Sequence, residues 1–170
     1  MSAQSVSSLQ RRIAKLLTRR NDTLACVEIE SGGLVSRSLT SVPGSSAYFA
    51  GALILAADAA LWPQAITGDR SWQHEPAGSH VRLDGAAAAA QQAFGAHWGL
   101  AVEYVPAMNA DSVHLALRTP NGSSVLEVMS PRVETVSTAE SAELSHEERL
   151  VQCILRCFAN RLQEICENLP

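Results

Sequence analysis

The amino-acid sequence predicts an α/β protein, a three-layer α/β/α sandwich around a mixed, mostly parallel sheet of about five strands. Two observations carry this prediction. Short apolar runs of strand length alternate with segments of helical periodicity, as is typical of helices packed on both faces of a sheet. An Asn-Gly turn at 121–122 joins two strand-like runs, and such a hairpin requires at least one antiparallel pair.

The first elements are expected within residues 7–56. A helix over 7–20 places its apolar side chains at the i, i+4, i+7, i+8 spacing of a core-facing stripe. The run over 23–28 is mostly apolar and predicts a short strand buried on both faces. Ser31-Gly32-Gly33 opens a helix through about Ser41, which the following Val-Pro-Gly ends. The apolar run over 48–56 predicts a second buried strand.

The middle of the chain is expected to contain two helices and a strand. Asp58 is suited to cap a helix that runs towards Ile66. Residues 67–79 mix Gly, Pro, Ser, His and Trp, which predicts a long exposed loop. An alanine-rich helix over 83–97 then leads into a strand over 100–105.

The last third predicts a hairpin and a long helix. The hairpin strands cover 113–118 and 124–129, and the stretch over 131–144 is polar and irregular. Ser145 and Glu148 fit a capping box at the start of the final helix, over 145–170. Its apolar residues repeat with the 3.6-residue period of a helix that lies on a sheet.

Composition restricts the possible partners. The chain has 170 residues and a net charge of −4, which predicts one domain over 1–170 and no nucleic-acid partner. The arginine-rich segment over 11–20 is best explained as the solvated face of the first helix, within the N-terminal segment 1–22. No apolar run approaches the roughly 20 residues of a membrane span, and the polar N-terminus lacks a secretory signal. We therefore expect a cytoplasmic protein without a membrane partner.

The cysteines and histidines predict neither a metal site nor a cofactor. The four cysteines form no CxxC pair, so buried reduced thiols are expected. The histidines lack the ordered spacing of a zinc site. A nucleophilic pair of Cys26 with a histidine is conceivable, but a thiol in an apolar strand is more often inert.

Residues 23–49, TLACVEIESGGLVSRSLTSVPGSSAYF, resemble the opening of the CinA carboxy-terminal domain family, the nicotinamide-nucleotide amidases. The segment FGAHWGLAV over 94–102 is a second, weaker match to that family. The resemblance implies the same three-layer fold in a stand-alone bacterial protein. It also implies a nicotinamide nucleotide or another small molecule as ligand, and self-association into a dimer or trimer.

The reactive groups that the resemblance implies are missing from this sequence. The family's serine nucleophile, tyrosine and lysine fall on Ile29, Ala56 and Leu61, and the only lysine of the chain is Lys15. Serine nucleophiles need an adjacent base, and none of these aliphatic side chains can attack or accept a proton. We therefore predict a catalytically degenerate relative of nicotinamide mononucleotide amidohydrolases that serves as a binding or interaction module.

Two alternatives stay open. The first is an active amidohydrolase with rebuilt groups, for which Ser31, Glu28 and Glu30 are the candidates. The second is a structural homo-oligomer whose pocket is filled by the added bulk at Ile29, Leu61 and Tyr104.

The residues expected to line a ligand site are Gly32, Gly33, Ser45, Ser46 and Glu103. If the strands over 23–28 and 100–105 are neighbours, Glu28, Glu30 and Glu103 would converge and repel an anion, or hold a hard cation. The simpler expectations are that Ser31 or Glu30 caps the following helix and that Glu103 points to solvent.

Overall fold

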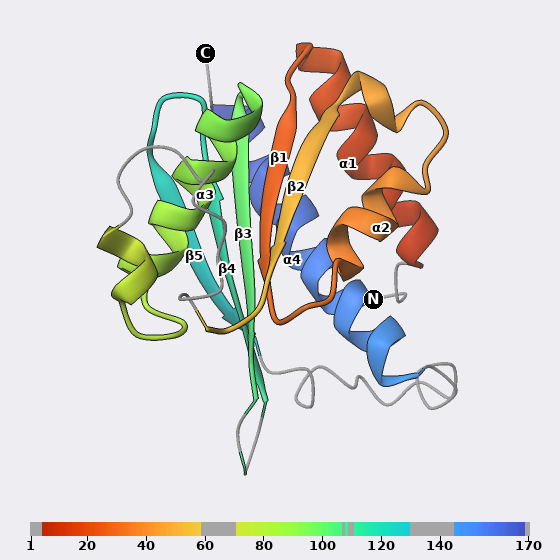
Figure 1. Cartoon of the computed structure of the whole chain (residues 1–170). Coiled ribbons are helices and arrows are strands. Elements are labelled where there is room, and N and C mark those ends of the chain that lie inside the picture. The colour runs from red at the N-terminus through yellow and green to blue at the C-terminus, as the bar shows by residue number, and fades with distance from the viewer. Residues whose placement is uncertain (1–4, 59–70, 107, 109–110, 130–144, 169–170) are drawn as a thin grey trace.

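The computed structural model of the chain describes residues 5–58, 71–106, 108, 111–129 and 145–168 (Figure 1). In chain order its elements are α1 (Val6–Arg20), β1 (Leu24–Ile29), α2 (Leu34–Thr40), η1 (Ser45–Ala47), β2 (Phe49–Leu55), η3 (Ser71–His74), α3 (His80–Phe94), β3 (Trp98–Val105), β4 (Ser112–Arg118), β5 (Ser124–Met129) and α4 (His146–Asn168). The predicted helix over 58–66 falls almost wholly outside the described residues, and the irregular stretch over 131–144 falls wholly outside them.

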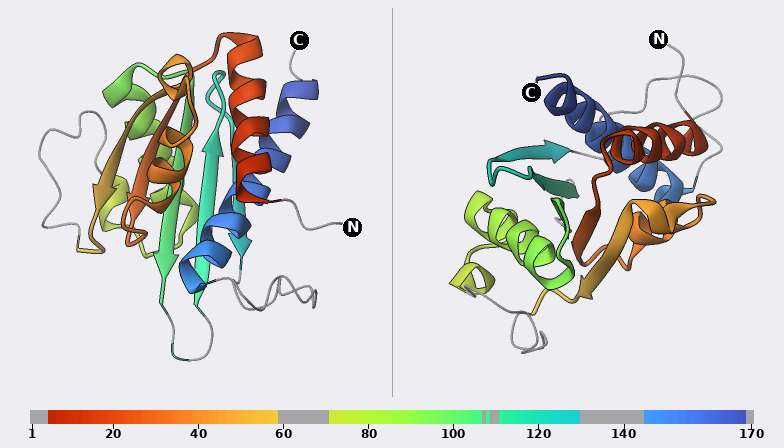
Figure 2. Two further views of the ribbon diagram at one scale, coloured as in Figure 1. Left: turned by 90° about the vertical axis from the view of Figure 1, so that its right-hand side faces the viewer. Right: turned by 90° about the horizontal axis from the view of Figure 1, so that it is seen from above.

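The strands form one mixed sheet in the order β2-β1-β3-β4-β5. β1 is parallel to β2 and β3, whereas β4 is antiparallel to β3 and β5. Helices α1, α2 and α4 cover one face of the sheet and α3 covers the other (Figures 1 and 2). The predicted three-layer fold around a five-stranded mixed sheet is confirmed.

The face under α1 and α4 holds the larger core. Leu9, Ile13 and Leu17 of α1 are fully buried there, while Lys15 on the opposite side of the helix is exposed. Trp98 of β3 is also buried in this core, and its indole N–H donates to Asp22 at 3.0 Å. The basic segment is thus the solvated side of an amphipathic helix, as its spacing predicts.

The α3 face is packed more closely because its side chains are small. A Cβ built on Gly99 of β3 would lie 2.1 Å from the carbonyl oxygen of Ala87, so only glycine fits there. Ala86 and Ala90 on the same helix are fully buried against the sheet. This close approach places the first turn of α3 beside the carboxyl end of β3.

Strand β2 differs from its prediction. It was expected to be buried, but it lies at the edge of the sheet and most of its residues are half-buried or exposed. The apolar run predicts a strand correctly, while its place in the sheet depends on strand order, which no local pattern specifies.

The predictions for two further segments differ from the structure. Helix α3 begins at His80 rather than 83 and ends at Phe94, because Ser79 caps its first turn and Gly95 adopts the left-handed conformation that ends it. In the segment expected as an exposed loop, residues 71–74 form a 3₁₀ turn with Trp72 buried. A Cβ at Gly85 would lie 2.3 Å from Trp72, so the missing side chain makes room for the indole.

Helix α4 begins as its sequence predicts. Ser145 N–H donates to the Glu148 carboxylate at 2.8 Å, and Glu148 N–H donates to the Ser145 hydroxyl at 3.2 Å. These reciprocal bonds form a capping box. The Ser145 main-chain N–H, with a smaller contribution from its side chain, lowers the pKa of Glu148, because it stabilises the ionised carboxylate.

Candidate functional site

The candidate site lies where β1 and β2 end, because the carboxyl ends of parallel strands meet at one edge of the sheet. Between Ile29 and α2 the chain turns through Glu30, Gly32 and Gly33, which have φ values of +58°, +62° and +81°. A Cβ on Gly33 would lie 2.8 Å from the end of the exposed Ile54 side chain, which could move, so the positive φ is what favours glycine there. Glu30 is a non-glycine residue in the left-handed region, which is uncommon and costs conformational energy.

Glu28 caps helix α2 from inside the protein. Its carboxylate is fully buried and accepts the N–H groups of Val35 at 3.1 Å and Ser36 at 2.7 Å. The hydroxyl of Ser31 donates to the same carboxylate at 2.6 Å, and the Ser36 hydroxyl donates to it as well. The prediction that Ser31 caps the helix is therefore wrong, because the cap is the Glu28 carboxylate. The N–H groups of Val35 and Ser36 are thereby occupied by a protein group.

Ile29 stands in the apolar core under α3. Its side chain is fully buried in a cluster that includes Leu55, Trp72 and Ala101. In the sheet register Ile29 lies between Leu55 of β2 and Glu103 of β3. The position that the resemblance assigns to a nucleophile is thus a packed core position.

The other two positions that the resemblance implies are less informative. Ala56 directly follows β2 and is exposed, and its methyl group can neither donate nor accept a proton. Leu61 lies outside the described residues. Tyr104, expected to help fill the pocket, packs against the core on the other face of the sheet from Ile29.

A buried ion pair lies between β3 and α3, in the region of Arg82, Glu103 and Gly78 that is called the crevice below. Arg82 and Glu103 are 4% and 2% exposed, and Arg82 Nε donates to the Glu103 carboxylate at 2.9 Å. The same carboxylate accepts the N–H of Gly78 at 2.7 Å. The expectation that Glu103 points to solvent is therefore wrong, since a charged partner holds it in the interior.

The remaining donors of the Arg82 guanidinium join three parts of the chain. Nη1 donates to the carbonyl oxygens of Gln73 at 3.0 Å and Glu75 at 3.3 Å, and Nη2 donates to that of Ala57 at 3.3 Å. Arg82 thus connects α3, the 71–75 segment and the end of β2. A planar guanidinium with five donors is suited to this role.

The three acidic residues do not converge. β1 and β3 are neighbours, as the argument required, but Glu28 points to the α2 face and Glu103 to the α3 face. Glu30 accepts the N–H of Ala57 at 2.7 Å and so joins the ends of β1 and β2, rather than capping a helix. The alternation of side chains along a strand separates them. A shared cation site formed by these three residues is thereby excluded.

The predicted ligand-binding positions also lie far apart in the structure. Gly32 and Gly33 follow the carboxyl end of β1, whereas Ser45 and Ser46 precede the amino end of β2, at the opposite end of the sheet. The Ser45 hydroxyl donates to the Thr40 carbonyl at the end of α2. Within one chain these residues do not form a single site.

Arg82 and its neighbours were not found by sequence reasoning. Arg82 precedes Ala86 by four residues and Ala89 by seven, so helical spacing places it on the buried face of α3. A buried arginine needs a carboxylate partner. That spacing is the signal that could have identified it.

His114 completes the neighbourhood of Glu103. It lies directly opposite Glu103 in the β3–β4 register, and its Nε2 is 3.0 Å from the Ser112 hydroxyl. Its Nδ1 is buried without a hydrogen-bond partner in the described part of the chain. A Cβ on Gly78 would lie 2.6 Å from this ring, so the chain before α3 packs directly on the histidine.

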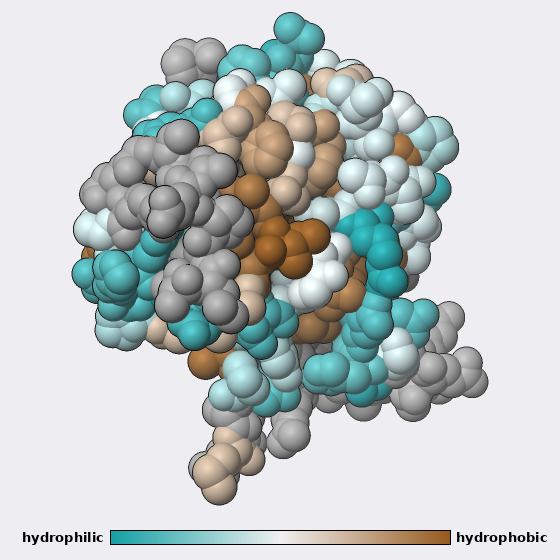
Figure 3. All heavy atoms as spheres, in the orientation of Figure 1, coloured by the Kyte–Doolittle hydropathy of each residue, from teal (hydrophilic) through white to brown (hydrophobic). Residues whose placement is uncertain are grey.

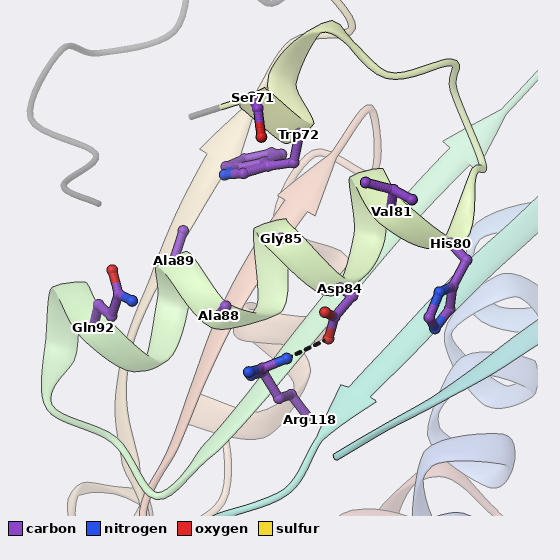
Figure 4. Close-up of a pocket in the computed structure, with 10 residues that line it drawn as sticks. All are labelled: Ser71, Trp72, His80, Val81, Asp84, Gly85, Ala88, Ala89, Gln92 and Arg118. Atoms are coloured by element: carbon purple, nitrogen blue, oxygen red, sulfur yellow. Dashed lines mark hydrogen bonds and ion pairs between the residues drawn. The ribbon is translucent and has the colours of Figure 1, made fainter. Parts of the chain in front are cut away.

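Among the cavities lined by described residues, two lie away from this crevice. One, of about 290 Å³, is on the outer side of α3, where Asp84 and Arg118 form an ion pair of 2.6 Å beside Gly85 and Trp72 (Figure 4). The other, of about 300 Å³, lies between α1, α2 and α4. Neither is lined by Ile29, Glu30 or Ser31.

Within the described ranges no group of three or more His, Cys, Asp or Glu side chains could hold a metal ion. Burial, with a smaller contribution from Glu28, raises the pKa of the Cys26 thiol well above its ordinary value, which disfavours the reactive thiolate. None of the helices searched in the described part has the length and apolar character that crossing a membrane requires.

Comparison with known proteins identifies the family. The CinA C-terminal domain matches residues 6–105, from α1 through β3. This chain belongs to that family. The CinA family match includes the turn after β1 and the strand that carries Glu103.

Relatives and solved structures agree with the family assignment. A CinA-like protein of Synechococcus sp. (strain RCC307) is 34% identical over 127 residues, which cover 71% of this chain and 30% of that protein. A CinA-like protein of Frankia casuarinae is 30% identical over 147 residues, covering 81% of this chain and 34% of its own length. The chain thus spans about a third of the length of these curated relatives.

The structural comparisons support the fold. A CinA superfamily protein from Enterobacter cloacae aligns with a TM-score of 0.73 at 16% identity and covers 95% of both chains. The competence/damage inducible protein CihA from Agrobacterium tumefaciens aligns with a TM-score of 0.67 at 21% identity, over 96% of this chain and 99% of its own. At these identities the likeness concerns the fold alone.

Proposed function

We propose that this chain is a CinA-family domain that does not hydrolyse amides and acts as an interaction module. The observation that carries the proposal is the environment of Ile29. A fully buried isoleucine, packed under α3, occupies the position of the family's nucleophile. Amide hydrolysis through a serine needs an exposed hydroxyl and a base beside it.

The groups that remain nearby support the same proposal. The only lysine, Lys15, is exposed on α1, away from the carboxyl ends of the strands. Arg82 is neutralised by Glu103 and hydrogen-bonded to three carbonyl groups. It therefore stabilises the crevice and is poorly placed to act as a base, since arginine stays protonated.

An assay of ammonia release from nicotinamide mononucleotide tests the proposal. The full chain should release no ammonia beyond a buffer control, when it is purified from a host that lacks its own nicotinamide-nucleotide amidase. Turnover that follows this protein through purification would overturn the proposal.

A second candidate, an amidohydrolase with rebuilt groups, rests on one contact. The Ser31 hydroxyl donates to the Glu28 carboxylate at 2.6 Å, which pairs a hydroxyl with a potential base. Ser31 is only 5% exposed, and Glu28 also caps α2, so this pair is better explained as part of the helix cap. If turnover is seen, Ser31→Ala should abolish it while leaving the circular dichroism spectrum unchanged. Glu30→Gln tests in the same way whether Glu30 is one of the rebuilt catalytic groups.

Small-molecule binding by the crevice is the weaker form of the proposal. The Arg82–Glu103 pair and the Gly78 N–H already satisfy one another there, so a nucleotide would have to displace buried contacts. Interaction through an outer surface requires no such displacement. It is also consistent with the self-association that the resemblance implies.

A further inference from the structure

Helix α1 concentrates positive charge on a chain that is net negative. Five of the 13 lysine and arginine residues lie within residues 11–20, although the net charge of the whole chain is −4. The first acidic residue of the sequence is Asp22, which follows the helix. A solvated helix face more typically mixes both signs, because opposite charges three or four residues apart stabilise it. Simple solvation of α1 therefore does not account for a face that carries one sign only.

Two of these five cations have partners inside the protein. Arg12 Nε donates to the Gln163 side chain and its Nη1 to that of Asn160, both on α4 and each at 2.9 Å. Arg20 forms an ion pair of 3.0 Å with Asp22. These two residues hold α1 against α4 and fix the turn that follows the helix.

The other three cations form an exposed row, called the basic stripe below, which consists of Arg11, Lys15 and Arg19. All three are exposed, and the described part of the chain provides no ion-pair or hydrogen-bond partner for their side chains. Their i, i+4, i+8 spacing places them on one side of α1, about 6 Å apart along its axis. The helix dipole accounts for a cation at Arg19, in the last turn, but not for Arg11 and Lys15.

The basic stripe offers charge and little apolar area. The apolar side chains of α1 at Leu9, Ile13 and Leu17 are buried in the core. Hydrophobic atoms on the face shown in Figure 3 gather instead along β2, where Ile54 is 57% exposed. A partner of the stripe is therefore selected by charge complementarity, which favours fast and specific encounter over high affinity.

We propose that the basic stripe is a docking surface for an acidic helix of a partner protein. Three carboxylates at the same i, i+4, i+8 spacing lie on one side of a helix and match Arg11, Lys15 and Arg19 in number and separation. Duplex nucleic acid and an anionic membrane fit less well, because both extend beyond a row one residue wide and meet the negative charge of the rest of the chain. This inference rests on the proposed interaction role and specifies its surface and the chemistry of the partner.

Fluorescence anisotropy of a labelled, stapled alanine-based peptide with glutamates at i, i+4 and i+8 tests the proposal. The full chain should bind it saturably, and added salt should weaken binding because it screens exposed charges. Lys15→Gln should lower the affinity by up to about fivefold, the effect of one exposed ion pair, and Arg11→Gln in addition should lower it further. Arg37→Gln is the matched control and should bind like wild type, since the Arg37 side chain is 72% exposed but already paired with Glu147.

A second peptide and two other polyanions keep the outcome decisive. A peptide of the same composition, with its glutamates on different faces of the helix, should bind more weakly. Glutamine is a good helix former, so the α1 variants should keep the circular dichroism spectrum of wild type.

No binding of the first peptide, equal binding of both peptides, or equal affinity of wild type and the double variant would overturn the proposal. Tighter binding of a labelled DNA duplex, or of phosphatidylserine vesicles in a sedimentation assay, would also overturn it. The ammonia assay is independent of these results, so failure of the proposed function is recognised separately.

Discussion

Arg82 is the residue that joins the most parts of the chain in the crevice. Its side chain is 5% exposed and its guanidinium contacts Glu103 and the carbonyls of Gln73, Glu75 and Ala57. Removing one member of such a pair leaves the other charge buried without compensation. The energetic cost of that loss far exceeds the net contribution of an exposed pair.

We predict that Arg82→Met lowers the free energy of unfolding by about 3–5 kcal/mol, the usual cost of breaking a buried ion pair. Urea denaturation measures this change. Arg118→Met is the matched control, because the Arg118–Asp84 pair is 24% and 31% exposed and should contribute no more than about 1 kcal/mol. The double variant Arg82→Met, Glu103→Met should recover part of the loss. Equal losses of unfolding free energy in Arg82→Met and Arg118→Met would contradict the role given to Arg82.

At the scale of residues, the sequence predicted the loss of the family's reactive groups better than it predicted the contacts now found near them. The aliphatic character of positions 29 and 56 can be read directly, and so can the exposure of the only lysine. The contact of Arg82 with Glu103 joins residues 21 positions apart on different elements. A contact of that kind depends on the tertiary arrangement, which residue types alone do not specify.

At the scale of elements, the closeness of α3 to the sheet depends on Gly99. We predict that Gly99→Ala destabilises the fold by about 1–3 kcal/mol or more, because the new methyl group would meet the Ala87 carbonyl, which the helix holds in place. Gly95→Ala is the control. Gly95 has open space around it, so the change should cost only the strain of its φ of +60°, about 1 kcal/mol. Thermal melts of both variants would contradict the account if Gly99→Ala were the milder change.

The capping box of α4 makes one pH-dependent prediction. Bonds from Ser145 lower the pKa of Glu148 in the folded state, so its contribution to stability is present above the ordinary glutamate pKa, about 4.3, and is lost as the pH falls through the lowered value. Ser145→Ala keeps its main-chain N–H, so it should cost about 1 kcal/mol at neutral pH but keep most of the acid dependence, whereas Glu148→Gln should remove that dependence. Denaturation curves collected between neutral and acidic pH measure both effects. Identical acid profiles for wild type and Glu148→Gln would contradict this role of the capping box.

The elements differ in how well the sequence predicts them. The capping box and the hydrophobic stripe of α4 are local patterns, and both are confirmed. The start of α3 was placed three residues late, because the Ser79 cap was not recognised. The hairpin is confirmed, but its connection covers 119–123 and only Gly122 of the Asn-Gly pair has a positive φ, of +86°.

At the scale of the whole molecule, alternation of strands and helices predicted the layers but not the strand order. The position of β2 at the edge follows from β1 pairing with both β2 and β3. The same alternation of side chains that buries β1 on both faces sends Glu28 and Glu103 to opposite layers. The placement of the candidate site at the strand ends stays a prediction, whereas the carboxylates of Glu28 and Glu103 lie in different layers of the molecule.

The most direct test of the account is a thermal-shift titration of the full chain with nicotinamide mononucleotide and its deamidated product. The account predicts no change in melting temperature with either compound, because Ile29 is packed in the core and Arg82, Glu103 and the Gly78 N–H already satisfy one another. A ligand at a hundred times its dissociation constant would stabilise the fold by roughly 2.7 kcal/mol, which is readily detected. A saturable rise in melting temperature with the nucleotide would contradict the account.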